Sequence, residues 1–142
     1  MRFQKTMLSL LMMGVSTIAL AKEDWQRIEF NNKTVNLYFD KNSIKPRTDE
    51  YNNRYLEARF SQIYQEPKKL SNGKFYTEFY QTLSVDCSHE AYATYNWNWQ
   101  INSKSVHRGE GKKDEWNKYD DEKNSTATQA RALCRYYKSF LG

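Results

Sequence analysis

The sequence predicts an α+β fold, in which an antiparallel sheet of about five to six strands carries one C-terminal helix. Much of the chain alternates apolar and polar residues with a period of two, which is typical of strands buried on one side. Residues 126–141 instead repeat apolar residues at helical spacing. One cysteine falls in each part, so a disulfide between Cys87 and Cys134 would tie the helix to the sheet.

Residues 1–21 are predicted to be a signal peptide. A positively charged start precedes an apolar run over 7–20, and Ala19-Leu20-Ala21 gives the small-x-small pattern at which signal peptidase cleaves. The run is shorter than the roughly 20 residues that span a bilayer, and Lys22 stands where a lipoprotein would carry its lipid-bearing cysteine. We therefore expect the signal peptide to be cleaved near Ala21 and residues 22–142 to form a single domain. This domain is expected to be exported to the periplasm, the cell surface or the medium, without a stable membrane anchor.

Five stretches show the strand alternation, namely residues 25–30, 35–40, 55–61, 75–87 and 91–101. In the last of these the odd-numbered residues, which include Trp97 and Trp99, share one face, and we expect that face to be buried. Turn-forming residues separate the strands, with Asn72-Gly73 as the clearest pair. Residues 103–124 are polar and charged, which indicates a long connection held to the body by Trp116.

The C-terminal stretch is predicted to be a helix of about four turns. Thr126 and Gln129 match a capping box, in which the hydroxyl and the amide each accept a free backbone N–H. The apolar stripe that follows contains Cys134, which can then reach Cys87 on the sheet. An even pair of cysteines in an exported protein most simply forms one disulfide.

Composition argues against several classes of function. Without the two basic residues of the signal, 20 basic residues stand against 17 acidic ones, a net charge of about +3 without a one-sided basic stripe, so we expect no nucleic-acid partner. Cys87, His89 and His107 supply too few ligands for a zinc site, and we expect no metal or other cofactor. No nucleophile, P-loop or dinucleotide motif is present, so the chain is not expected to be an enzyme; a small hydrolase would depend on the two histidines alone.

A tyrosine-rich face is the candidate binding surface. If the odd-numbered positions of 75–87 and 91–101 point inward, the opposite face carries a set of candidate protein-binding residues, with Asn96 and Asn98 among them. The candidates are Tyr38, Tyr55, Arg59, Tyr76, Tyr80 and Tyr92. Tyr, Asn and Arg are the residues that binding loops use; in the alternative interpretation, tyrosines simply cover an exposed sheet. One helix of about 10 Å cannot cover five strands spanning about 24 Å, so the sheet curls, the connection around Trp116 folds over it, or a second copy covers it in a homodimer.

Short motifs spread over the mature chain resemble the bacterial surface-adhesin protein E family. They comprise an early Trp, a Y-x-D-x-x-S-I motif, a central V-D-C and a terminal cysteine. Here these positions are Trp25, Tyr38, Asp40, Ser43, Ile44, Val85, Asp86, Cys87 and Cys134. The resemblance implies an antiparallel sheet tied to a C-terminal helix by the cysteine pair, in an envelope protein of a Gram-negative bacterium. It places a single adhesin-E-like domain over residues 22–142.

The resemblance also implies a function in adhesion, with host laminin, vitronectin or plasminogen as partners, but no ligand-binding residue can be transferred position by position. The sequence departs from the founding adhesin, a lipoprotein, at Lys22. The leading hypothesis is an exported binding protein that recognises host matrix or plasma proteins through its sheet surface. The alternative is a soluble periplasmic envelope factor, an inhibitor or chaperone-like helper, with no host ligand.

Overall fold

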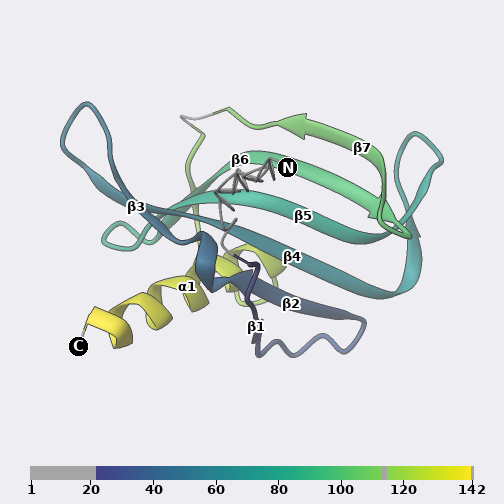
Figure 1. Cartoon of the computed structure of the whole chain (residues 1–142), viewed down its shortest axis with the longest axis horizontal. Coiled ribbons are helices and arrows are strands. Elements are labelled where there is room, and N and C mark those ends of the chain that lie inside the picture. Colours follow the sequence, from purple (N-terminus) through teal and green to yellow (C-terminus); the bar gives the residue numbers. More distant parts are fainter. Residues whose placement is uncertain (1–21, 113–114, 142) are drawn as a thin grey trace, which may run out of the picture.

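The computed structural model describes residues 22–112 and 115–141, so the predicted signal peptide lies outside the described residues. The predicted fold class is confirmed: an antiparallel sheet carries a single C-terminal helix on one face (Figure 1). The sheet has eight strands, more than the five to six expected. We call the face that carries the helix the inner face and the opposite face the outer face.

Six strands form the body of the sheet in the order β1-β2-β4-β5-β6-β7, while β3 pairs with β4 and β8 with β6. A short 3-10 helix, η1, follows β2. The elements are β1 (Trp25–Ile28), β2 (Val35–Asp40), η1 (Lys41–Ser43), β3 (Lys45–Thr48), β4 (Arg54–Lys69), β5 (Phe75–Asp86), β6 (Ala91–Ile101), β7 (Lys104–Glu110), β8 (Asn117–Lys118) and α1 (Ser125–Leu141). No helix in the described part of the chain is both long and apolar enough to cross a membrane.

Three strands lie where the sequence indicated turns or a long connection. β3 contains Pro46, which is tolerated because a strand at the margin of a sheet can lack one donor. β7 and β8 both fall within the expected connection over 103–124. β7 follows β6 through Asn102 and Ser103, whose positive φ angles of 49° and 63° suit the tight turn of a hairpin. Its exposed, polar sequence offers no alternation of apolar residues to detect.

The core lies between α1 and the inner face. The sheet contributes the buried side chains Leu37, Phe39, Leu56, Ala58, Phe60, Leu83 and Val85, and the helix contributes Ala127, Ala130 and Leu133. The predicted disulfide is present: Cys87, which directly follows β5, bonds to Cys134 of α1 across 47 positions of sequence. It fixes the helix to the sheet covalently at one edge of the core.

A buried amide knot joins the start of α1 to the sheet. Gln129, which is 0% exposed, donates from Nε2 to the Ser61 carbonyl at 2.8 Å and to the Tyr38 carbonyl at 3.2 Å. Its Oε1 accepts from Nε2 of Gln62 at 3.0 Å and from Nε2 of Gln81 at 3.2 Å. Every buried side-chain donor and acceptor in the described residues has a partner. The knot therefore satisfies polar groups that would be costly if left unpaired.

The expected capping box is absent, because its two residues belong to the knot. The Thr126 hydroxyl accepts from the Gln81 amide at 3.1 Å instead of capping a backbone N–H. Asn124 is the N-cap, since its Oδ1 accepts from the backbone N–H of Ala127 at 3.0 Å. Thr126 and Gln129 do lie at the start of the helix, but their side chains bond to residues of the sheet and not to each other's backbone.

A β-bulge in β6 changes which residues face the helix. Leu83 of β5 pairs with Thr94, whereas the preceding residue Thr82 pairs with Asn96, so Tyr95 is one extra residue in β6. On the N-terminal side of the bulge the even-numbered residues therefore point inward, and on the C-terminal side the odd-numbered ones do. The expectation of one continuous odd-numbered face over 91–101 is wrong for this reason.

Candidate functional site

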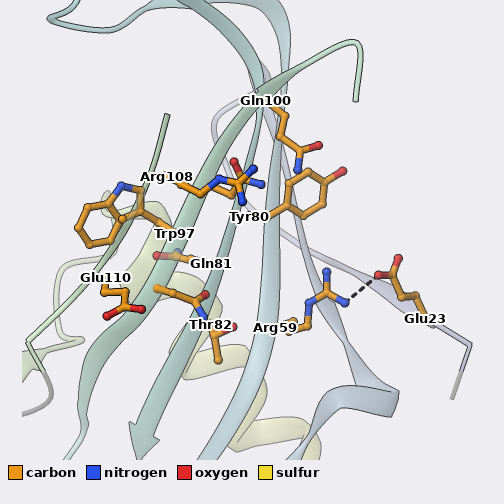
Figure 2. A pocket seen from close by; sticks show the side chains of 12 residues that line it. Glu23, Arg59, Tyr80, Gln81, Thr82, Trp97, Gln100, Arg108 and Glu110 are labelled. Carbon is orange, nitrogen blue, oxygen red and sulfur yellow. Dashed lines mark hydrogen bonds and ion pairs between the residues drawn. The ribbon is translucent and has the colours of Figure 1, made fainter. Parts of the chain in front are cut away.

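The outer face is hollowed into a groove of about 510 Å³, which we call the outer groove. Its floor and walls come from β4, β5, β6 and β7 together with the segment before β1 (Figure 2). Its lining includes Glu23, Arg59, Tyr80, Asn96, Gln100 and Arg108, and Gln81 and Trp97 also border it. Because these side chains come from five different segments, the groove depends on the register of the whole sheet.

The N-terminal wall of the outer groove is held by contacts of Glu23 and Trp25. Glu23 pairs with Arg59 at 2.7 Å, as the dashed line in Figure 2 marks. The indole N–H of Trp25 donates to the other carboxylate oxygen of Glu23 at 3.1 Å. The Arg59 guanidinium lies 5.8 Å from the centre of the Trp25 ring, and the Tyr80 ring lies 6.0 Å from it. These contacts hold an aromatic surface beside a paired charge.

Two pKa shifts report on this wall. The hydrogen bond from Arg59, followed by that from Trp25, lowers the pKa of Glu23, so this carboxylate stays ionised. Burial raises the pKa of Tyr80 to about 12, and the negative charges of Glu78 and Glu23 add to the shift. Tyr80 therefore remains a neutral phenol, and its hydroxyl donates to Glu78 at 3.2 Å.

The floor carries a row of amides on β6. Asn96, Asn98 and Gln100 alternate along the strand, so their side chains share the outer face about 6.7 Å apart. Asn98 uses its carbonyl oxygen to accept from the Ser105 hydroxyl at 2.6 Å. Within the described residues, the side chains of Asn96, Gln100 and Arg108 make no hydrogen bond or ion pair. These groups are available to a ligand.

Four of the six candidate binding residues lie on the outer face. Arg59 and Tyr80 line the outer groove. Tyr38 of β2 pairs with Ser61 of β4, which pairs in turn with Tyr80 of β5, so Tyr38 and Tyr80 share the outer face. Tyr55 is also on the outer face, but it lies outside the groove and packs edge-on against Trp116 at 6.3 Å. Trp116 thus attaches the connection to the body of the protein, as the sequence indicated.

The other two candidates lie on the inner side. Tyr92 is 8% exposed and belongs to the main core, because the bulge at Tyr95 turns it toward the helix. Tyr76 is equally buried, with its ring centre 4.3 Å from that of Trp99. A register shift between Ile63 and Lys68 of β4 accompanies this inward placement. The tyrosine set is therefore split between the two faces.

Sequence reasoning did not find Glu23, Gln100 or Arg108 as groove residues. Arg108 lies on β7, which has no apolar alternation, and Glu23 lies before the first predicted strand. The alternating amides of β6 were the available signal for the floor. No three His, Cys, Asp or Glu side chains among residues 22–112 and 115–141 are grouped as a metal site.

Comparisons with known proteins give one weak similarity. No family model and no curated protein matches the sequence. Among solved structures, the crystal structure of protein E from non-typeable Haemophilus influenzae is similar to this chain, with 17% sequence identity and a TM-score of 0.43. The similar region covers 80% of this chain and 78% of the protein E chain. A similarity this weak carries no argument about function.

Proposed function

We propose that this chain is an exported binding protein that recognises another protein through the outer groove. The observation that carries the proposal is the row of amides on β6, two of which have no side-chain partner among the described residues. The strand fixes the backbone of these residues, so binding has to order only their side chains, at about 0.5–1.5 kcal/mol each. By the sequence resemblance, the partner class is host matrix or plasma proteins such as laminin, vitronectin or plasminogen.

The amides suit an extended segment of the partner. An Asn or Gln amide has the same donor and acceptor as a peptide group, so it can pair with backbone N–H and C=O. Alternate residues of an extended chain repeat at about 6.7 Å, which matches the spacing of the side chains of Asn96, Asn98 and Gln100. The Trp25 and Tyr80 rings then offer aromatic surface to the side chains of that segment.

A second candidate partner follows from the same amides. Side chains that pair with backbone groups recognise any extended polypeptide, whatever its sequence. That property suits a periplasmic helper that holds unfolded envelope proteins as well as it suits an adhesin. The two candidates share the groove and differ in where the protein is located and in what it meets there.

Binding measurements with paired variants test the proposal. Laminin, vitronectin, plasminogen and a permanently unfolded polypeptide, reduced and carboxymethylated α-lactalbumin, are immobilised, and the purified mature protein is passed over them. The double variant Asn96→Ala, Gln100→Ala should weaken binding about thirtyfold, because two hydrogen bonds contribute about 1 kcal/mol each. Gln65→Ala, an exposed amide of β4 outside the groove, is the matched control.

The pattern of binding separates the two partner classes. Selective binding to one of the three host proteins supports the adhesin, and binding to the unfolded polypeptide alone supports the helper. Protease treatment of intact cells then shows whether the protein faces outward. Equal binding by the wild type and the double variant would remove the outer groove from consideration.

A further inference from the structure

A second groove lies on the inner face, beyond the start of α1. It encloses about 730 Å³, and we call it the aromatic groove. One wall consists of Tyr64, Phe79, Trp97 and Trp99, and the other of residues 110–112 and 123–126. Phe79 and the two tryptophans are not part of the main hydrophobic core. The amide knot, through Gln62 and Gln81, lies between the groove and that core.

The aromatic wall is rigid. Trp99 stacks on Phe79 with ring centres 3.9 Å apart and planes inclined by 23°. Tyr76 packs against the same indole at 4.3 Å, and Tyr64 packs edge-on against Tyr76 at 5.4 Å. Rings locked in this way present a fixed surface to a ligand without a further loss of rotamer freedom.

Trp97 lies over the edge strand because residue 109 is a glycine. A Cβ on Gly109 would clash with Cζ2 of Trp97, because the two atoms would lie closer together than a Cβ and a neighbouring heavy atom do in real proteins. The indole therefore covers the backbone of β7, where any larger residue would displace it. It is half-buried, and no other aromatic ring in the described residues packs on it. Trp97 therefore borders both the aromatic groove and the outer groove with part of its side chain exposed.

The charged side chains of the aromatic groove cancel: two glutamates and two lysines line it, of which Glu110 and Lys123 form no ion pair within the described residues. Lys112 forms an ion pair with Glu115 at 3.5 Å on one wall. The side chains of Thr94 and Asn117 make no hydrogen bond within the described part of the chain, so they can donate and accept. A ligand here meets a fixed aromatic surface together with neutral hydrogen-bonding groups.

We propose that the aromatic groove binds a neutral oligosaccharide. One face of a pyranose ring carries C–H groups that suit the electron-rich face of an indole, and its hydroxyl groups can pair with Thr94 and Asn117. An oligonucleotide would need an excess of cations for its phosphates, whereas the two lysines that line the groove are balanced by Glu110 and Glu115. A lipid chain would leave the polar wall unpaired. The aromatic groove shares Gln81, Trp97 and Glu110 with the outer groove, but the proposed glycan does not depend on the function proposed for the outer groove.

Titration with two neutral glycans tests the proposal. Chitohexaose and cellohexaose are added to the mature, disulfide-bonded protein, and binding is followed by calorimetry and by the indole N–H signals in the NMR spectrum. We expect saturable binding in roughly the millimolar range or tighter, with the signals of Trp97 and Trp99 shifting most. Trp97→Ala and Gly109→Ala should each weaken binding at least tenfold, the second because it displaces an indole that is still present. Trp25→Ala, on the outer face, should bind as the wild type does.

Three results would overturn the proposal. The first is the absence of saturable binding of either glycan at about 10 mM with the wild-type protein. The second is unchanged affinity in a folded Trp97→Ala or Gly109→Ala variant, with folding checked by circular dichroism. The third is a shift of the Trp99 signal with an extended peptide and with neither glycan, which would assign the aromatic groove to polypeptide, because Trp99 does not line the outer groove. If both variants fail to fold, the indole signals of the wild type decide between these outcomes.

Discussion

Replacing Gln129 with glutamate tests whether the amide knot holds the helix to the sheet. Gln129→Glu keeps the size of the side chain but replaces the N–H donors to the Ser61 and Tyr38 carbonyls with oxygen. A buried carboxylate there would face two acceptors, so the folded protein must hold it protonated. The pKa of the new carboxyl is therefore raised on folding.

The size of the effect follows from that pKa. A free Glu titrates at about 4.3, and a pKa that is higher by one in the folded state than in the unfolded state corresponds to about 1.36 kcal/mol. Keeping residue 129 protonated in the folded state at pH 7 thus costs at most about 3.7 kcal/mol. The protonated acid has one donor where the amide had two, which costs about 1 kcal/mol more at every pH. We expect a loss of about 1 kcal/mol at pH 4 and about 4–5 kcal/mol at pH 7.

Urea unfolding at several pH values measures the difference between variant and wild type. Because the pKa of residue 129 is raised in the folded state, the variant is only about 1 kcal/mol less stable than the wild type below pH 4, and it loses further stability as the pH rises toward that pKa. Gln65→Glu, an exposed position on β4, introduces the same charge without burial and should show no such dependence. A loss that is small and independent of pH would show that the knot is open to water.

Three further perturbations test other parts of the structure. Cys87→Ser with Cys134→Ser should lower the free energy of unfolding by about 4 kcal/mol, because the disulfide closes a 47-residue loop; urea unfolding measures this, and a loss below about 1 kcal/mol would contradict it. Trp25→Ala should lower the pKa of Tyr80 from about 12 toward its ordinary value near 10, because it exposes the phenol; phenolate absorbance follows the titration, and an unchanged value would assign the burial to other neighbours. Asn124→Ala should cost about 1 kcal/mol in thermal unfolding because the Ala127 N–H loses its acceptor, and no change would argue against this cap.

The fold class could be predicted because two periods dominate the sequence. Strands that contribute to the core, such as β2 and β5, alternate apolar and polar residues cleanly, and the cysteine pair joins the sheet to the helix. The strands that were missed are β3, β7 and β8, whose side chains are mostly exposed. Backbone pairing to a neighbour, rather than burial, defines them, and a single sequence carries little record of such pairing.

The candidate site was predicted in part. Arg59 and Tyr80 lie together on the outer face, and the amides of β6 alternate as the strand period requires. Tyr92 was assigned to the wrong face because one bulge residue shifts the alternation, and a bulge of this kind leaves no distinctive residue type in the sequence. The role of Glu23 could not be inferred, since its contact with Arg59 spans 36 positions.

The bulge at Tyr95 allows β6 to place Tyr92 in the core and also to contribute side chains to both proposed sites. Before it, Tyr92 points into the core under α1; after it, Trp97 and Trp99 point the same way but lie beyond the start of the helix, where they form a wall of the aromatic groove. Because successive side chains alternate, turning the tryptophans inward necessarily turns Asn96, Asn98 and Gln100 outward. Without the extra residue, a strand that kept Tyr92 in the core would turn its tryptophans to the outer face and its amides to the inner face. Both proposed sites therefore depend on the same local irregularity, although they lie on opposite faces of the sheet.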